Sequence, residues 1–323
     1  MAAAIAMSVG ETALASALQI WVDPDGSAYL VMERLFGDWQ PSAHVHAGGA
    51  IEATTGRRRS VAEATKKLVR LEIADGIAVL TNDRPEKHNA ANDEMDRQLF
   101  DALEELHARP DVRVVLWRGT GKSFSSGRDT SEIGVRSEDI TNFEFIERGH
   151  RRTQLFFTLP APMLVAMHGW VIGGSFERAL LADMRIAAEG TRMMLPEIKY
   201  GVVPDSGGTA RLFQMAGHGL VADLAMTCRA MDAEEALRHG IVSRVVPAEK
   251  LEEVAMEMCR EIASHPPFAV KMFRRTLSRI GHPLVQRTMQ EESMGMTAIY
   301  ETQDYREMKA ARAENRPPKY RGR

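Results

Sequence analysis

Three acidic residues stand in parts of the sequence that otherwise favour apolar packing. Glu177 lies in the run VIGGSFERALLADMRIA, while Glu197 and Asp205 each follow a proline within MMLPEIKYGVVPDSGGTARL. Apolar surroundings disfavour the charged form of a carboxyl group and raise its pKa, which makes it a candidate general acid. Acids whose pKa values are pushed apart can deliver one proton to a substrate and remove another. We therefore take these three residues as the candidate catalytic groups.

Two glycine-containing junctions could supply the complementary group, a pair of backbone N–H donors. The segments SFSSGRDT and HGWVIGGSFERA each place glycine after an expected strand and before a helical stretch. Glycine allows unusual dihedral angles, and the first amides of a helix have no partner within it. Two such junctions that face one point could stabilise an oxyanion. Each junction alone is a weak signal, because glycine often only ends an element.

The spacing in the second junction places a candidate acid near a candidate backbone donor. Glu177 follows Gly174 by three residues, so both lie on one face of the expected helix, about one turn apart. A simpler interpretation is an ion pair of Glu177 with Arg178 or Arg185, because charged helix faces are usually only solvated. The residues themselves leave both interpretations open.

The elements that must position these groups follow an alternating pattern. KLVRLEIADGIAVLTND alternates apolar and polar residues on both sides of Asp75 and Gly76, which predicts a two-residue hairpin. A helix follows, with Asn92 as its N-cap and an apolar stripe at helical spacing. Alternating strands and helices predict an α/β architecture with crossover connections. The further segments are the strands VRVVLWRGT, APMLVAMHG and MRIAAEG, the helix TNFEFIERGHRRTQLFFTL and a helix from Gly173.

The two ends of the chain differ from this regular part. Residues 1–66 are rich in alanine and glycine and run into the polar stretch TTGRRRSVAEATKK, so we expect a partly disordered extension and linker. Within it, IWVDPDGSAYLVM could form a hairpin, because PDG favours a turn. His44 and His46 lack further ligands at a recognised metal spacing, which favours an exposed loop. The C-terminal part is expected to be helical, including PFAVKMFRRTLSRI, and the tail ENRPPKYRGR to be ordered only by contact.

Composition and charge argue against several function classes. The formal net charge of -3 and the pI near 6.4 indicate no basic surface for nucleic acid or an anionic membrane. No window approaches the roughly 18 apolar residues of a membrane-spanning helix, and the N-terminus lacks the basic start of a secretory signal. The two cysteines, Cys228 and Cys259, are far apart, which favours neither a disulfide framework nor a metal site. We expect a cytoplasmic protein without a metal.

Taken jointly, several motifs resemble the crotonase (enoyl-CoA hydratase/isomerase) superfamily from about residue 68 to 323. They are RPEKHNAA, GTGKSFSSGRD, the long stretch PAPMLVAMHGWVIGGSFERALLADMRIAAEGTRMMLPEIKYGVVPDSGGTARL and the closing ENRPPKYRGR. The resemblance implies a crotonase-like spiral of ββα turns over residues 67–262. It also implies a C-terminal helical trimerisation region over residues 263–323, and assembly as a homotrimer or homohexamer.

The resemblance further implies an acyl-CoA thioester as substrate. Its carbonyl oxygen would be held by the backbone amides of Arg128 and Gly174, which would stabilise an enolate. CoA would enter as part of the substrate, with no separate cofactor. By the same match, the residues that line the substrate are Lys87, Ala90, Ser126, Asp129, Thr130, Gly173 and Pro196.

Three functions follow from this resemblance. Members that hydrate a 2-enoyl-CoA, or dehydrate a 3-hydroxyacyl-CoA, use two glutamates that match Glu177 and Glu197, so a hydratase is favoured. The alternative is an enoyl- or dienoyl-CoA isomerase that uses Glu197 and Asp205. A second alternative is a non-catalytic acyl-CoA-binding subunit in which Arg178 neutralises Glu177. The acyl group is not identified by the sequence.

The chain departs from the family pattern at several positions near the site. A small residue often stands where Arg128 is found, and its side chain could fill part of the CoA or acyl channel. The usual run of three glycines ends here in Ser175, which would bring a hydroxyl near the thioester. Phe176 and Arg178 replace smaller or apolar residues, so the shape of the pocket is expected to differ. Thr130 and Ser131 also replace the usual aliphatic and basic pair.

Overall fold

The computed structural model describes residues 18–22, 28–32, 66–132 and 139–323, and the chain forms two compact units, Met1–Thr65 and Lys66–Arg323. In the first unit, β1 (Leu18–Val22) pairs antiparallel with β2 (Ala28–Met32), which confirms the predicted hairpin. The turn of this hairpin, the two histidines of HVH and the arginines at 57–59 lie outside the described residues.

A six-stranded sheet with the order β11-β8-β6-β5-β4-β3 organises the second unit. Strands β3 and β4 form the predicted antiparallel hairpin. Both residues of its turn have positive φ, 52° at Asp75 and 77° at Gly76. This is the backbone that a tight two-residue hairpin requires. The other pairings are parallel. The strands are β3 (Val69–Ala74), β4 (Ile77–Asn82), β5 (Val114–Gly119), β6 (Met163–Met167), β8 (Met184–Ala188) and β11 (Arg244–Val246).

A second, three-stranded sheet turns this architecture into a spiral. It has the order β10-β9-β7, with β7 (Trp170–Ile172) parallel to β9 (Arg192–Met194) and β10 (Met231–Asp232) antiparallel to β9. Each turn gives one strand to each sheet and then a helix: β6, β7 and α4 (Gly174–Leu181), then β8, β9 and α5 (Gly208–Thr227). The expected ββα spiral is confirmed. The strands of the small sheet are too short for a periodic pattern to predict.

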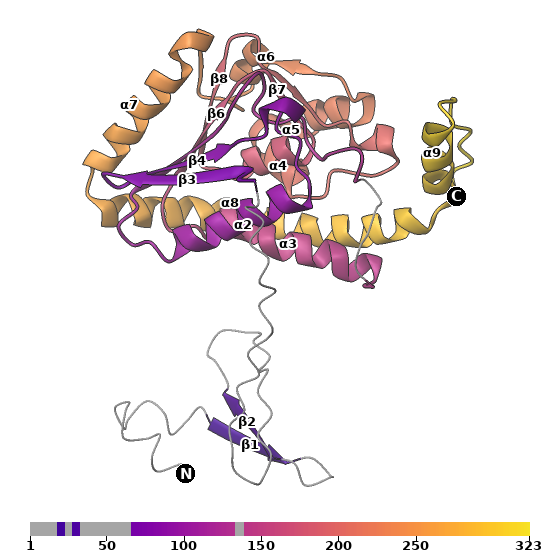
Figure 1. Cartoon of the computed structure of the whole chain (residues 1–323), viewed down its shortest axis with the longest axis horizontal. Helices are drawn as coiled ribbons and strands as arrows, with labels where there is room; N and C mark the ends of the chain where they lie inside the picture. The colour runs from indigo at the N-terminus through magenta and orange to yellow at the C-terminus, as the bar shows by residue number, and fades with distance from the viewer. Residues whose placement is uncertain (1–17, 23–27, 33–65, 133–138) are drawn as a thin grey trace. The chain divides into compact units, whose positions relative to one another are not determined.

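Alternating side chains on the large sheet are covered by different helices. Val114 and Leu116 pack against α7 (Leu251–Ser264), whereas Val115 and Trp117 belong to the core on the opposite face. That opposite core includes α2 (Asp93–His107) and α3 (Asn142–Thr158), which lie beside each other below the sheet in Figure 1. Because a sheet buried on both faces needs apolar residues at every position, these strands read as continuous apolar runs.

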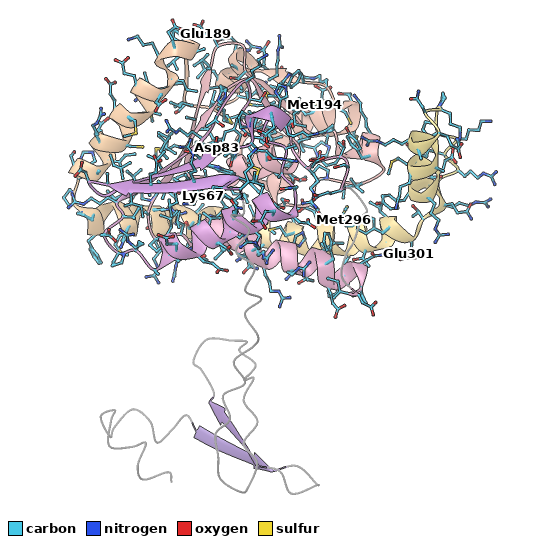
Figure 2. All side chains as sticks on the ribbon, viewed as in Figure 1. Lys67, Asp83, Glu189, Met194, Met296 and Glu301 are labelled. Atoms are coloured by element: carbon cyan, nitrogen blue, oxygen red, sulfur yellow. The ribbon has the colours of Figure 1, made fainter. Side chains whose placement is uncertain are left out.

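The C-terminal region packs onto this core through one long helix. α8 (Pro267–Glu301) extends 35 residues, well beyond the predicted segment that ended at Ile280, and it contains Pro283. A proline removes one helical hydrogen bond, and burial of Val285 and Met289 in the main core favours continuation of the helix beyond it. Glu301, labelled in Figure 2, ends this helix close to α9 (Gln303–Ala313). The remaining helices are η2 (Pro85–Lys87), η3 (Glu197–Tyr200), α6 (Ala233–Arg238) and η4 (Ala248–Lys250).

The C-terminal tail is ordered by contacts with α9, as the sequence predicted. Arg316 forms an ion pair with Glu307, and the carboxylate of Asp304 accepts the backbone N–H groups of Arg321 and Gly322. Among the helices of the described residues, none combines the length and apolar character needed to cross a bilayer.

The cap of α2 gives a test of the fold. Asn92 accepts the N–H of Met95 through its side chain at 2.9 Å, as its predicted role as N-cap requires. We expect Asn92→Ala to lower the free energy of unfolding by about 1 kcal/mol in urea titrations at fixed protein concentration. Glu104→Ala, an exposed change near the C-terminal end of the same helix, should have little effect. Equal losses in the two variants would contradict this role of Asn92.

Candidate active site

A cavity of about 630 Å³ lies where the loops after the strands meet α2, α3 and α8. Most of the residues predicted from the sequence line it together, although they come from distant parts of the chain. They are Ser126, Arg128, Thr130, Gly173, Gly174, Glu177, Pro196, Glu197 and Asp205. The other three, Lys87, Ala90 and Asp129, lie in the adjoining loops and do not line this cavity.

One unpaired amide belongs to Arg128. Its neighbours on either side bond to Ala91: the N–H of Ala91 donates to the carbonyl of Gly127 at 2.7 Å, and the N–H of Asp129 donates to the carbonyl of Ala91 at 2.8 Å. In a parallel bridge of this kind, the N–H of the middle residue points to the other side. Within the described part of the chain, the amide of Arg128 donates to no acceptor.

The second unpaired amide belongs to Gly174, the first residue of α4. Gly173 precedes it with φ of 59°, and the N–H of Gly173 donates to the carbonyl of Met194 at 2.8 Å. The next amide therefore begins the helix, and no acceptor for it exists among the described residues. A Cβ atom on Gly173 would lie 2.8 Å from Oε1 of Glu197, so the Glu197 carboxyl group lies directly beside this turn. Glycine is needed here for both its dihedral angles and its size.

Glu177 is held by a row of backbone amides. Its side chain is only 1% exposed, and its carboxylate accepts the N–H groups of Asp205 at 3.3 Å, Ser206 at 3.0 Å and Gly208 at 3.1 Å. Gly208 begins α5, and a Cβ atom there would lie 2.4 Å from Cγ of Glu177. The absence of a side chain at this position therefore lets the helix start approach the carboxylate.

Burial shapes the protonation of the three predicted acids. It raises the pKa of Glu177 well above its usual range, as do the neighbouring charges of Glu197, Glu292 and Asp205. Burial also raises the pKa of Glu197 to about 7, with a smaller contribution from Asp205. The pKa of Asp205 is raised by burial as well, against the opposing effect of His150 and Arg178. Glu197 can therefore exchange a proton near neutral pH.

Glu197 has an oxygen available for a ligand. Its buried Oε2 atom has no hydrogen-bond partner within the described residues, although the side chain lines the cavity. A buried carboxyl oxygen without a partner is costly unless a ligand or water completes it. This oxygen therefore needs a water or a ligand as its partner.

A fourth acid, Glu292 of α8, was not predicted from the sequence. It accepts the N–H of Gly207 at 3.2 Å, and burial raises its pKa to about 7. It thus holds the same loop whose other amides bind Glu177. Its separation of 85 residues from Gly207 leaves no local signal in the sequence.

Arg178 does not pair with Glu177, which corrects one expectation from the sequence. Its guanidinium donates to Asp96 at 2.7 Å and lies 5.2 Å from the centre of the Phe100 ring. Arg185 is also unavailable, because it donates to backbone carbonyl groups, including that of Ile241 at 2.7 Å. Glu177 instead forms its bonds with amides, because α4 directs Arg178 towards α2.

Arg128 and Ser175, which also depart from the family pattern, form contacts that the sequence did not predict. Arg128 bonds to Asp93, Asp96 and Glu132 and lines the cavity. Ser175 is buried, does not line the cavity and bonds to Ser125. The hydroxyl that was expected near the thioester therefore bonds to Ser125 and lies outside the lining of the cavity.

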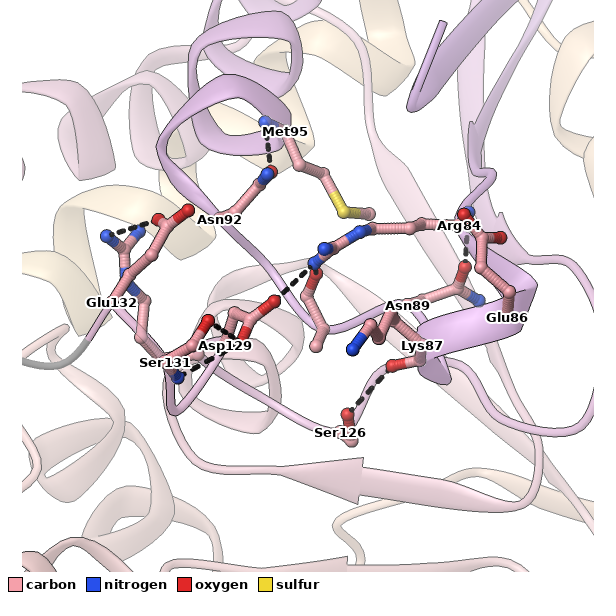
Figure 3. Close-up of polar contacts among 12 residues, drawn as sticks. Arg84, Glu86, Lys87, Asn89, Asn92, Met95, Ser126, Asp129, Ser131 and Glu132 are labelled. Atoms are coloured by element: carbon pink, nitrogen blue, oxygen red, sulfur yellow. Dashed lines mark hydrogen bonds and ion pairs between the residues drawn. The ribbon is translucent and has the colours of Figure 1, made fainter. Parts of the chain in front are cut away.

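The adjoining loops are joined by a polar network that Figure 3 shows. Arg84 donates to Asp129 at 2.8 Å and to the carbonyl of Ala90 at 2.9 Å. Hydrogen bonds from Ser131 and Arg84 lower the pKa of Asp129 to about 2, so this side chain is ionised and holds the loop. Ser126 donates to the carbonyl of Lys87 at 3.4 Å.

No group of three or more metal-binding side chains is arranged for a metal ion in the described residues.

A spiral of ββα turns that brings two residues with unpaired amides and several buried acids to one cavity defines a protein of the crotonase fold. The family model for enoyl-CoA hydratase/isomerase matches residues 72–323, and the chain belongs to this family.

Curated and solved relatives agree with this membership. The chain is 31% identical over 247 residues to the short-chain-enoyl-CoA hydratase of Clostridium acetobutylicum, covering 76% of this chain and 94% of the relative. It is 33% identical over 252 residues to the carnitinyl-CoA dehydratase of Salmonella typhi, covering 76% and 95%. The crystal structure of an enoyl-CoA hydratase/isomerase from Pseudoalteromonas atlantica superimposes with a TM-score of 0.72 at 27% identity, covering 79% of this chain and 100% of that chain.

The raised pKa of Glu292 predicts how stability depends on pH. Its pKa moves from 4.5 to about 7, so between these values the unfolded state binds fewer protons than the folded state. The free energy of unfolding should therefore fall as pH rises through this window. We expect Glu292→Gln, which cannot ionise, to lose less stability than the wild type between about pH 5 and about pH 8 in urea titrations.

The exposed neighbour Glu291 offers a matched control, because Glu291→Gln changes the same helix without entering the buried cluster. This control should keep the pH dependence of the wild type. If Glu292→Gln also keeps it, the buried carboxyl does not titrate in this window.

Proposed function

We propose that this protein is an enoyl-CoA hydratase that adds water to a 2-enoyl-CoA thioester, or dehydrates a 3-hydroxyacyl-CoA in the reverse direction. The observation that carries the proposal is the placement of Glu177 and Glu197 in one cavity with the unpaired amides of Arg128 and Gly174. Family membership supports the same reaction. CoA enters as part of the substrate, and the chemistry requires no separate cofactor.

The two amides would act on the thioester carbonyl. As water adds at C3, negative charge develops on the carbonyl oxygen, and N–H donors that already point at this position stabilise it without reorganising. The start of α4 contributes, because the N-terminus of a helix attracts negative charge. Loss of one such donor typically costs about 2.7 to 4 kcal/mol of transition-state stabilisation.

The two glutamates would move the protons. One ionised carboxylate takes a proton from water as its oxygen attacks C3, while a protonated carboxyl group delivers a proton to C2. A pKa near 7 suits Glu197 to this proton delivery, and its side chain lines the cavity. Glu177 is fixed by three amides, so its orientation is set before substrate arrives.

The isomerase alternative is favoured by one observation, the presence of Asp205 in the same cavity. With Glu197, it could take a proton at one carbon of the acyl chain and return it at another. The non-catalytic alternative has lost its structural basis, because Arg178 pairs with Asp96 instead of neutralising Glu177.

Substitution of Glu197 tests the hydratase. We expect Glu197→Gln to lower kcat for hydration of crotonyl-CoA by about 10²-fold or more, because a positioned proton donor is lost. Turnover is measured as loss of the absorbance of the conjugated thioester. Glu189→Gln is the matched control, since Glu189 is exposed and does not line the cavity.

A different outcome would point to the isomerase. No 2-enoyl-CoA would lose its conjugated absorbance, while a 3-enoyl- or dienoyl-CoA would shift its double bond in a reaction abolished by Asp205→Asn. That result would replace the hydratase by the isomerase. Binding of acyl-CoA without either reaction, and without exchange of C2 protons with solvent, would support the binding subunit.

We also propose assembly as a homotrimer or homohexamer, with a cytoplasmic location and no nucleic-acid or membrane partner. An exposed apolar stripe on α8 supports the assembly, since Phe273, Leu277, Ile280 and Leu284 recur every three or four residues and share a face. Contiguous exposed apolar surface of this kind typically marks a protein interface. The buried free thiols Cys228 and Cys259 are compatible with a reducing compartment.

The assembly is tested by a charge in this stripe. Ile280 is 74% exposed, and Ile280→Glu should reduce the mass of the particle in light scattering, because a charge in an apolar interface is costly. Arg275→Glu is the control, since Arg275 is exposed and lies about 140° round the helix from Ile280. A wild-type protein with the mass of a monomer would contradict the proposal.

A further inference from the structure

Two buried serines meet between the segments that carry the unpaired amides. The Oγ atoms of Ser125 and Ser175 lie 2.7 Å apart, and both side chains are buried. Ser125 belongs to the loop that continues to Arg128, and Ser175 directly follows Gly174 in α4. The pair therefore joins the loop that carries one amide to the helix that carries the other.

The partners of Ser125 fix the direction of this hydrogen bond. Its hydroxyl donates to the carbonyl of Asn89 at 2.7 Å, and its oxygen accepts the N–H of Gly127 at 3.2 Å. Because a hydroxyl has a single proton, Ser125 can only accept from Ser175. Within the described residues, the Ser175 hydroxyl has no other partner. Donation thus runs from Ser175 to Ser125 and on to Asn89.

The far end of this chain is rigid. The side-chain amide of Asn89 donates to the carbonyls of Thr120 at 2.9 Å and Ser123 at 2.8 Å, and its oxygen accepts the N–H of Arg84. Asn89 also has a positive φ of 54°, so its carbonyl is held in one direction by a tight turn. The serine pair is therefore anchored to a fixed point in the loop next to η2.

Backbone hydrogen bonds hold the oxyanion loop to β7 and to Ala91, and the Ser125 hydroxyl adds a side-chain contact between these two anchors. Ser125 bridges to β7 through bonds with Trp170 at 3.1 Å and Ile172 at 3.1 Å. Beyond this bridge, the Ser125 hydroxyl holds the N–H of Gly127, the residue before Arg128. Ser175 then adds the link from this hydroxyl across to α4.

We propose that Ser125 and Ser175 are positioning residues that set the separation and direction of the Arg128 and Gly174 amides. This inference rests on the proposed use of these amides as the oxyanion hole. The glycine that the family pattern places at position 175 could not make this bond, so the link depends on the departure from that pattern. Neither serine touches substrate, and both act through the backbone of their neighbours.

The test begins with Ser175→Ala, which removes the hydroxyl and keeps the helix. Loss of one neutral hydrogen bond that orients the donors should lower kcat for crotonyl-CoA by about tenfold. KM and the affinity for unreactive butyryl-CoA should change little, because contacts with CoA are retained. Ser125→Ala should have a similar or larger effect, and the double variant should fall short of the product of the two.

A spectroscopic measurement separates positioning from general loss of structure. The carbonyl stretching frequency of butyryl-CoA, labelled with ¹³C at the thioester, reports hydrogen bonding to its oxygen. In Ser175→Ala, the frequency of the bound ligand should move towards that of the free ligand. Ser123→Ala is the matched control. Ser123 lies in the same loop as Ser125, and its buried hydroxyl bonds to His88 and does not reach α4.

The outcomes are distinguishable. Unchanged kcat and unchanged carbonyl frequency in Ser175→Ala would overturn the inference, as would equal effects in Ser123→Ala. Should Ser175→Ala be insoluble, Ser175→Gly removes the same hydroxyl and carries the same expectations. If wild type binds butyryl-CoA with a shifted carbonyl frequency but turns over no 2-enoyl-CoA, the proposed reaction fails while the frequency shift still tests the serine pair.

Discussion

The site depends on one physical constraint: a carboxylate that is almost fully buried must be met by backbone amides. Glu177 satisfies it with three N–H groups from the turn that opens α5. That contact fixes α4 against α5, and it tolerates no side chain at Gly208. Since α4 also begins with the unpaired amide of Gly174, the contact that holds the buried acid also places this amide. The Glu177 carboxylate is therefore positioned only when α4 has packed against the start of α5.

The protonation of the acids at the cavity is set by burial rather than by ion pairs with basic residues. Glu177, Glu197, Asp205 and Glu292 share one poorly solvated region, and burial raises the pKa of each. A basic residue bonded directly to them would favour ionisation and reduce their ability to carry protons. The structure instead directs Arg178 to an acid on α2. The guanidinium remains near enough to favour the charged form of Asp205 without neutralising Glu177.

Local motifs predicted much of the fold because their physics is local. The turn at Asp75, the cap at Asn92 and the helix after Gly173 depend on neighbouring residues, and the structure has all three. Short strands such as β7 were missed because three residues carry no reliable period. The length of α8 was missed because Pro283 normally ends a helix, whereas packing of the following turns outweighs its cost.

The candidate acids, the glycine turns and the family could be read from the sequence alone, since these depend on residue types in a fixed order. The partners that the charged groups choose emerged only from the folded chain. Glu292 reaches Gly207 across 85 residues, and Arg178 reaches Asp96 across 82. Such contacts depend on how helices pack after the chain has folded, and a side chain bonds to what lies within about 3 Å rather than to what is near in sequence. The pairing of Ser125 with Ser175 belongs to the same class.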